Sequence, residues 1–250
     1  MKNINLFLLL IGIWAVAFLP KQPTASDALT GAWKTIEVNG EAVPVDITYI
    51  FASGYGMYSV YDLEKKQFLE AAGGSYEVKD NSFLVSVEYH TTDTSQVGKS
   101  IIFSLTAGED ETMLMEGEDS KGEKISILLK RLDYGDTPLS GNWRISERMR
   151  EGKMSPMRPG PRKTLKILSG TRFQWAAINP ETKQFRGTGG GTYTFENGKY
   201  TENIEFFSRD SSRVGMSLGF DGSVEGEAWT HSGFSSKGAP IKEIWRIDAY

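Results

Sequence analysis

Short runs of alternating hydrophobic and polar residues follow one another along the chain, separated by Gly, Asn, Asp and Ser. A period of two, together with many β-branched and aromatic residues, is typical of β-strands. In the first half the pattern predicts strands at 32–38, 47–52, 55–62, 74–79, 82–90, 99–105, 112–117 and 124–132. In the second half it predicts strands at 142–148, 164–169, 172–178, 191–196, 199–207, 213–220, 224–231 and 240–248. After the N-terminal segment, no window has the apolar stripe of an amphipathic helix.

The pattern of strands recurs because one passage occurs twice. Residues 64–103 align with residues 181–220 at a constant offset of 117, so that Gly73-Gly74-Ser75-Tyr76 falls on Gly190-Gly191-Thr192-Tyr193. A match of this length indicates duplication. Eight antiparallel strands per copy predict an all-β protein of two tandem up-and-down β-barrels, because closing a sheet leaves no unpaired edge. A two-sheet sandwich is the alternative for each copy.

The repeat divides the chain into two domains, 29–133 and 139–250, joined by a turn-rich linker at 134–138. Ahead of them, residues 1–28 are expected to be a signal peptide, because the almost wholly apolar run at 4–19 is short for a membrane span. An uncleaved anchor is the alternative. The prediction places the protein in the periplasm or outside the cell, with no membrane contact after cleavage.

Composition and motifs narrow the classes of function. The chain contains no cysteine, which excludes disulfides, thiolate metal sites and a cysteine nucleophile. It carries no Gly-x-Ser-x-Gly, phosphate-loop or dinucleotide motif, and its two histidines are not spaced as metal ligands. We therefore expect no cofactor, no metal and no enzymatic activity. Nucleic acid is not an expected partner of an exported chain with a net charge of −4.

Charge is distributed unevenly between the two copies. Residues 29–133 hold 9 Lys and Arg against 18 Asp and Glu, a net charge of −9. Residues 139–250 hold 17 against 12, a net charge of +5. Opposite charges favour docking of the acidic first copy against the basic second copy. Two solvated surfaces that have diverged independently are the alternative.

Each copy begins with Gly-x-Trp at a strand start, at Trp33 and Trp143, and ends with an arginine in its last strand, Arg131 and Arg246. These features resemble the lipocalin signature, and the copies are similar to bacterial secreted proteins described as lipocalin-like. The resemblance implies eight-stranded barrels in which the Trp closes one end and the Arg packs across it, so that Trp33 pairs with Arg131 and Trp143 with Arg246. Typical lipocalins also have disulfides and a helix after the barrel, so the resemblance bears on the fold more than on a transport role.

The second copy holds the residues that we expect to form a ligand site. In strand 199–207, alternation puts Glu202 and Phe206 on the inward face, and Glu202 stands where the first copy has Val85. An inward carboxylate needs a partner or a ligand, although a position near the strand end that reaches water is the alternative. The residues expected to line the cavity are Trp175, Tyr193, Glu202, Phe206 and His231. Ordinary core packing is the alternative for the aromatic residues, and a surface position for His231.

The loop at 149–163 follows the first strand of the second copy and is six residues longer than its counterpart. The difference in residue number between matching residues of the two copies is 110 before this loop and 116 after it. In a lipocalin-like barrel this connection lies at the open mouth. Methionine is a pliable apolar contact, and arginine grips carboxylates and phosphates with two hydrogen bonds. We expect Met154, Met157 and Arg158 at the mouth. A solvated loop or a docking site is the alternative.

These residues favour an exported binding protein for a small hydrophobic or amphipathic ligand, which can be anionic, with its site mainly in the second barrel. The first barrel is then expected to be filled by its own side chains. The alternative is a ligand-free structural or interaction module of the periplasm or cell surface. An enzyme that uses Glu202 or Glu205 with His231 is disfavoured, because alternation points the two carboxylates to opposite faces.

Overall fold

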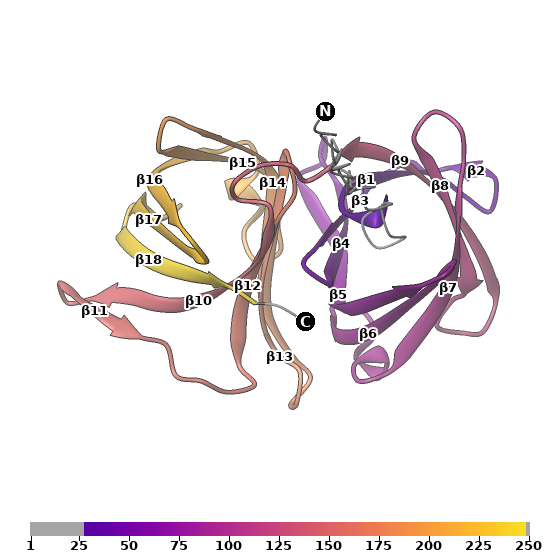
Figure 1. Cartoon of the computed structure of the whole chain (residues 1–250), viewed down its shortest axis with the longest axis horizontal. Helices are drawn as coiled ribbons and strands as arrows, with labels where there is room; N and C mark the ends of the chain where they lie inside the picture. Colours follow the sequence, from indigo (N-terminus) through magenta and orange to yellow (C-terminus); the bar gives the residue numbers. More distant parts are fainter. Residues whose placement is uncertain (1–27, 249–250) are drawn as a thin grey trace, which may run out of the picture.

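Two closed antiparallel β-barrels lie side by side in the computed structural model, which describes residues 28–248 (Figure 1). The predicted signal segment falls outside this range except for its last residue. Among the described residues, no helix has the length and apolar character needed to cross a membrane. The prediction of two tandem eight-stranded barrels is confirmed, and the sandwich alternative is wrong because the last strand of each copy pairs with the first.

The first barrel consists of eight strands in sequence order, each hydrogen-bonded to the next, and the β1–β9 pairing closes it. The short strand β2 pairs with β1 outside the closed ring. A 3₁₀ turn, η1 at Thr94–Gln96, separates β6 from β7. The strands are β1 Gly31–Val38, β2 Glu41–Ala42, β3 Asp46–Ala52, β4 Tyr55–Asp62, β5 Gln67–Lys79, β6 Ser82–His90, β7 Ser100–Ala107, β8 Thr112–Glu118 and β9 Lys124–Asp133.

The second barrel repeats this order and is closed by the β10–β18 pairing. Strands β11 and β12 pair with the two halves of β10 and not with each other in the described pairings, which leaves a gap in the barrel wall between them. Its 3₁₀ turn is η2, Ser211–Arg213. The strands are β10 Gly141–Arg150, β11 Lys153–Pro156, β12 Lys163–Leu168, β13 Arg172–Asn179, β14 Gln184–Glu196, β15 Lys199–Phe207, β16 Ser217–Glu225, β17 Ala228–Phe234 and β18 Pro240–Ile247.

A β-bulge interrupts the pairing of β5 with β6 and of β14 with β15. The extra residue is Glu88 on β6 and Glu205 on β15. A bulge shifts the alternation of faces by one residue, so the side chains beyond it point to the opposite side. Phe206 therefore points out of the second barrel, where it stacks on Tyr61 of the first barrel, and Phe207 points inward. The prediction that Phe206 lines the cavity is wrong for this reason.

Gly191 is required by the second bulge, because a Cβ at this position would lie 2.0 Å from the carbonyl oxygen of Asn203. Replacing Gly191 by Ala is expected to lower the free energy of unfolding by about 1–3 kcal/mol, since the backbone must shift to relieve the contact. Gly219→Ala in β16 is the matched control, because no atom lies within 4 Å of its Cβ. Urea denaturation followed by tryptophan fluorescence measures both variants. Equal midpoints would contradict this role of Gly191.

The two barrels contact each other through an apolar surface. Strands β12 and β13 are buried on both sides, because one side faces the barrel interior and the other faces the first barrel. The outward residues of these strands pack with outward residues of β3, β4 and β5, which removes apolar area from water. The shared cluster contains Ala32, Ile50, Ala52, Tyr55, Met57, Ala71, Tyr89, Leu165, Ile167, Ala176 and Ile178.

Aromatic stacking across this surface follows the repeat. Tyr89 and Phe206 stand at equivalent positions directly after the two bulges. Tyr89 stacks on Phe185 of the second barrel with ring centroids 6.2 Å apart, and Phe206 stacks on Phe68 of the first barrel at 6.1 Å. The bulge that reverses the side-chain direction thus supplies each barrel with an aromatic ring for its neighbour.

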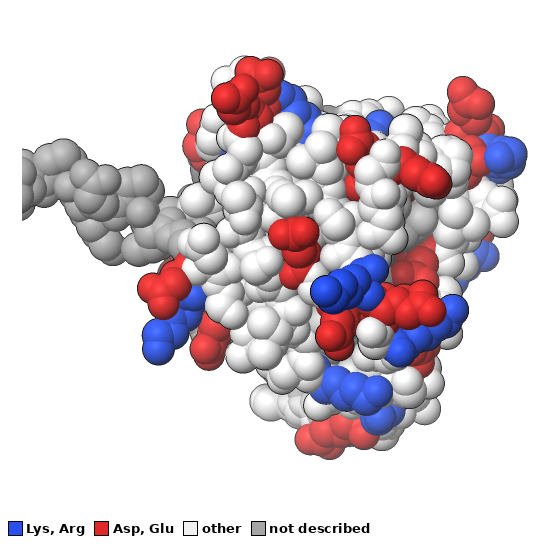
Figure 2. Space-filling view, turned by 90° about the vertical axis from the view of Figure 1, so that its right-hand side faces the viewer, with Lys and Arg blue, Asp and Glu red and all other residues white. Residues whose placement is uncertain are grey.

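Both bulge carboxylates also bind across the contact. Glu205 accepts a hydrogen bond of 2.6 Å from the Tyr61 hydroxyl of the first barrel and pairs with Arg172 at 2.6 Å. Glu88 pairs with Lys163 of the second barrel at 2.8 Å. The Lys163–Glu88 pair joins a base of the second copy to an acid of the first. Figure 2 shows the outer face of the first barrel, where acidic side chains are scattered among basic ones.

Asp133, at the end of β9, binds the turn between β12 and β13. Its carboxylate accepts hydrogen bonds from the Gly170 and Thr171 amides at 2.8 and 2.9 Å. The hydroxyls of Ser169 and Thr171 donate to it at 2.9 and 2.7 Å. Burial alone would raise the pKa of Asp133, but these hydrogen bonds outweigh burial and lower it. The end of the first barrel is therefore held directly to the second.

The tryptophan of the first strand is buried at one end of each barrel. The indole NH of Trp33 donates to the Leu29 carbonyl at 2.8 Å, and the Arg131 guanidinium lies 4.0 Å above the ring centroid. The indole NH of Trp143 donates to the Leu139 carbonyl, also at 2.8 Å. This is the arrangement that the lipocalin resemblance implies for Trp33 with Arg131.

The predicted pairing of Trp143 with Arg246 is wrong. The cross-strand neighbour of Trp33 is Arg131, whereas that of Trp143 is Ile247. Arg246 is exposed, because alternation along β18 puts the buried Trp245 inside the barrel and Arg246 outside. The sequence alignment of the two C-terminal strands is therefore off by one residue, and an apolar side chain takes the place of the arginine.

Candidate functional site

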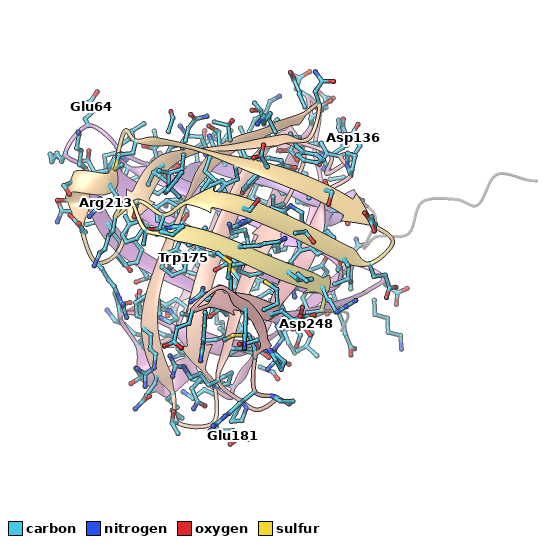
Figure 3. All side chains as sticks on the ribbon, turned by 90° about the vertical axis from the view of Figure 1, so that its left-hand side faces the viewer. Glu64, Asp136, Trp175, Glu181, Arg213 and Asp248 are labelled. Carbon is cyan, nitrogen blue, oxygen red and sulfur yellow. The ribbon has the colours of Figure 1, made fainter. Side chains whose placement is uncertain are left out.

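The interior of the second barrel contains a cavity of about 450 Å³. Its walls come from nearly every strand of the barrel, and Figure 3 shows Trp175 alongside the yellow strands β16–β18. The apolar lining residues are Trp175, Ala177, Ile204, Phe207, Leu218, Phe220, Ile241 and Trp245. The ionisable ones are Arg148, Arg162, Lys166, Arg186, Glu202, Arg209, His231 and Glu243. The cavity is therefore amphipathic and has more cationic than anionic groups.

Lys166 and Glu202 form an ion pair inside the barrel. The Lys166 ammonium lies 2.5 Å from the Glu202 carboxylate, and each side chain is 7% exposed. The Tyr200 hydroxyl donates to the same carboxylate oxygen at 3.0 Å. The ammonium also lies 5.3 Å from the Trp245 ring centroid, within the range of a cation–π contact. The charge of Glu202 is thus balanced by Lys166 and one hydrogen bond.

Glu243 is the second interior carboxylate. It pairs with Arg148 at 2.6 Å and accepts a hydrogen bond of 3.1 Å from the indole NH of Trp245. His231 lies 3.6 Å from the same carboxylate, and neither of its ring nitrogens has a hydrogen-bond partner among the described residues. Burial, and then the charge of Lys166, hold the pKa of His231 well below its usual range, so the ring is neutral near pH 7.

Three of the residues predicted for the site line this cavity: Trp175, Glu202 and His231. Tyr193 does not, because it is buried at the end near the linker, where its hydroxyl donates to the Ser169 carbonyl at 2.6 Å. Burial raises the pKa of Tyr193 to about 12. The prediction that Tyr193 contacts a ligand in the cavity is wrong for this reason.

The loop residues predicted at the barrel mouth lie on and beside the β10–β11 hairpin. Met157 and Arg158 line a groove of about 840 Å³ on the outer side of β10, between that strand and the loop before β12. Met154 lies on β11 opposite Met149 and lines neither this groove nor the cavity. The extra residues extend the β10–β11 hairpin, and Met157 packs against the hydrophobic core cluster of the second barrel.

This groove is rich in basic side chains and adjoins the cavity. Arg148, Arg162 and Thr164 line both, at the gap in the wall between β11 and β12. The basic residues of the groove are Arg144, Arg148, Arg150, Arg158, Arg162, Lys163 and Arg246. The interior of the second barrel can therefore be reached through a passage lined by arginine.

The prediction that the first barrel is filled by its own side chains is wrong. Its interior contains a cavity of about 410 Å³ with predominantly apolar walls. Phe51 of β3 and Phe83 of β6 meet across the barrel with ring centroids 5.6 Å apart, and both rings line the cavity. The apolar lining residues include Val38, Ile47, Tyr49, Phe51, Met57, Phe83, Val85, Val87, Ile101, Phe103, Met115, Ile125 and Ile127.

The two cavities are built on the same positions with different side chains. Corresponding strands of the two barrels pair in the same register, so each interior position of one barrel has an equivalent in the other. The charged interior positions of the second barrel are equivalent to uncharged residues of the first. Lys166, Glu202, His231, Glu243 and Arg148 correspond in this order to Tyr49, Val85, Met115, Ile127 and Val38. Duplication therefore kept the wall and changed the chemistry of the interior.

A polar group lies at one end of the first cavity. The Tyr58 and Thr92 hydroxyls both donate to Glu70, and His90 lies 3.9 Å from this carboxylate. The Asp93 amide donates to Nδ1 of His90 at 3.2 Å. Burial, followed by the charge of Glu70, raises the pKa of Tyr58 well above its usual value. A ligand in this cavity would meet apolar walls and one rim that can form hydrogen bonds.

Sequence reasoning missed Lys166, Glu243 and the arginines of the second cavity. Lys166 lies in the apolar run of β12. The only sign of it in the sequence is a lysine between two apolar residues, which are buried in the structure. Arg162, Arg186 and Arg209 come from three separate loops or strands, and only the closed barrel brings them together. Between residues 28 and 248, no group of three or more His, Cys, Asp or Glu side chains could hold a metal ion.

No family model matches the chain, and none of the curated proteins is significantly similar to it. Among solved structures, it is similar to a lipocalin-like protein from Bacteroides uniformis, with 12% identity and a TM-score of 0.32 over 45% of this chain and all of that one. It is also similar to transferrin-binding protein B from Haemophilus parasuis, with 9% identity and a TM-score of 0.23 over 83% of this chain and 66% of that one. The assignment of the fold therefore rests on the strand pairing, which gives each half of the chain the strand order and closure of a lipocalin-like barrel.

Proposed function

We propose that the protein binds a small, uncharged, predominantly apolar molecule in the first barrel. The observation that carries this proposal is the cavity of about 410 Å³, whose walls are formed by aliphatic and aromatic side chains with the Glu70 group at one rim. Its size lies within the usual range of ligand pockets, roughly 300–1,000 Å³. The sequence placed the ligand mainly in the second barrel, and the proposal moves the apolar ligand to the first.

Transfer from water to this cavity favours an apolar ligand by about 25 cal/mol for each Å² of its apolar surface that is buried. The interior positions that Lys166 and Glu202 occupy in the second barrel are held here by the uncharged Tyr49 and Val85. The carboxylates of the lining are Glu70, Asp93, Glu118 and Asp119. A ligand hydroxyl or carbonyl can instead bind at the rim, where Tyr58 and His90 line the cavity. The favoured class is thus a neutral molecule with an apolar body and at most one or two polar atoms.

Val85→Phe is expected to weaken binding of the neutral probe N-phenyl-1-naphthylamine at least tenfold, because the larger ring occupies the cavity that Val85 lines. Leu84→Phe is the matched control: Leu84 is the adjacent residue of β6 and is not part of the cavity wall. Fluorescence titration of the probe measures both dissociation constants. Wild-type protein that does not bind the probe, or equal binding by the two variants, would refute the proposal.

We propose that this binding function is carried out in the periplasm or outside the cell, and the apolar run at 4–19 supports this proposal. The alternative function is a ligand-free interaction module, which was expected to have filled barrel interiors. The open cavity of the first barrel favours ligand binding over that alternative.

A further inference from the structure

The second cavity differs from the first in the charge of its walls. Lys166 is paired with Glu202, and Arg148 with Glu243. The three remaining arginines of the wall, Arg162, Arg186 and Arg209, have no carboxylate partner among the described residues. Besides these polar groups, the cavity has apolar walls such as Trp175 and Phe207. The surplus charge of the walls is therefore positive.

His231 is an independent sign that this cavity takes a polar ligand. The side chain is 1% exposed and lines the cavity, yet neither ring nitrogen has a hydrogen-bond partner among the described residues. An unpaired buried polar group costs about 1–3 kcal/mol, which a ligand hydroxyl or carboxylate oxygen can recover. The other polar groups at this depth, Lys166, Glu202, Glu243 and Trp245, already have partners.

We propose that the second barrel is a separate binding site for a small amphipathic organic anion. Its carboxylate, or a similar acidic group, binds Arg162, Arg186 and Arg209, because guanidinium groups bind such groups through paired, charge-assisted hydrogen bonds. Its aromatic or aliphatic body packs against Trp175 and Phe207. The arginine-lined gap between β11 and β12, where the cavity meets the outer groove, is the entry.

Neutral molecules are not the ligands of this site, because only an anion gives the three exposed arginines of the wall charge-assisted hydrogen bonds. Small inorganic anions do not fill the apolar part of the cavity. The two barrels thus divide ligand classes between them. The second site does not depend on the first, since no side chain lines both cavities.

The test compares 2-naphthoate with its neutral analogue 2-naphthylmethanol by isothermal titration calorimetry of the full-length protein. We expect 2-naphthoate to bind at least tenfold more tightly than the alcohol, since a charge-assisted hydrogen bond is worth about tenfold or more in affinity. The variant Arg162→Gln/Arg186→Gln/Arg209→Gln is expected to lose this preference. Lys199→Gln is the control, because Lys199 is an exposed base of the same barrel outside the cavity.

Two further measurements separate this proposal from the one for the first barrel. Val85→Phe is expected to leave 2-naphthoate binding unchanged. The triple arginine variant is expected to bind N-phenyl-1-naphthylamine as tightly as the wild type does. If neither protein binds this probe, equal midpoints of urea denaturation show that the triple variant is folded. The proposal is overturned if 2-naphthoate does not bind, if the folded triple variant binds it as tightly as the wild type, or if Val85→Phe abolishes its binding.

Discussion

Replacing Lys166 by methionine is expected to lower the free energy of unfolding by about 3–5 kcal/mol, because it leaves the Glu202 carboxylate buried without its counter-charge. The ion pair of 2.5 Å is enclosed by the rings of Phe173, Tyr200 and Trp245, and both members are 7% exposed. Because the Glu202 side chain is only 7% exposed, hydration from the cavity replaces little of the lost counter-charge. Urea denaturation at pH 7, followed by tryptophan fluorescence, measures the effect.

The matched variant removes both charges. Lys166→Met/Glu202→Val is expected to be within about 1 kcal/mol of the wild type or more stable, because a well-packed apolar pair often replaces a buried ion pair without loss. Val is the residue that the first barrel has at the position of Glu202. If the double variant were as unstable as Lys166→Met, the loss would come from packing, and the account of the ion pair would fail.

Replacing Asp133 by alanine is expected to lower the free energy of unfolding by about 3 kcal/mol, because hydrogen bonds to a charged group contribute about 1.5–3 kcal/mol each and several are lost together. The amides of Gly170 and Thr171 are left with no acceptor from the first barrel. Asp133→Asn keeps one acceptor oxygen and is expected to fall between the wild type and the alanine variant. Leu132→Ala, an exposed neighbour on β9, is the control.

The contribution of Asp133 also has a defined pH dependence. Its pKa is lowered in the folded protein, so the folded state favours the ionised form, and the stabilisation is fully present above the ordinary carboxyl pKa of about 3.9. It is lost as the pH falls below that value and through the lowered pKa. The difference in unfolding free energy between the wild type and Asp133→Ala should therefore be largest at neutral pH and shrink in acid. A difference that stays constant with pH would contradict the role of the charge.

Much of the fold could be predicted from the sequence, because period-two alternation marks a strand wherever one face is buried and the other meets water. The prediction placed most strands within a few residues of their observed ends. It missed the N-terminal halves of β5 and β14, where glycine and alanine obscure the alternation. It also missed β2 and β11, because both are short and pair with one neighbour only.

The direction of Phe206 could not be predicted, since a bulge leaves no mark in the alternation itself. The glycines opposite the two bulges, Gly73-Gly74 and Gly190-Gly191, are present in both copies, but tandem glycines alone do not specify a bulge. The pairing shows that they accommodate the bulge, which turns Phe206 and its counterpart Tyr89 toward the other barrel. The contact between the barrels follows from this local feature.

The first cavity could not be predicted because alternation tells which face is apolar, not whether the side chains on that face meet across a closed barrel. Val85 and Met115 point inward as the pattern suggests, yet space remains between them and the opposite wall. In the second barrel the same limitation hid the partner of Glu202, since Lys166 stood in a strand that is apolar on both faces. The inward carboxylate itself was visible by comparison with Val85.

Crystallography with 1-bromonaphthalene tests the central claim most directly, because the anomalous signal of bromine marks the position of the bound neutral apolar molecule. The account predicts bromine density inside the first barrel, among Tyr49, Val85 and Met115, and none in the charged interior of the second. Bromine bound beside Lys166 and Glu202, or only on the outer surface of the protein, would contradict it.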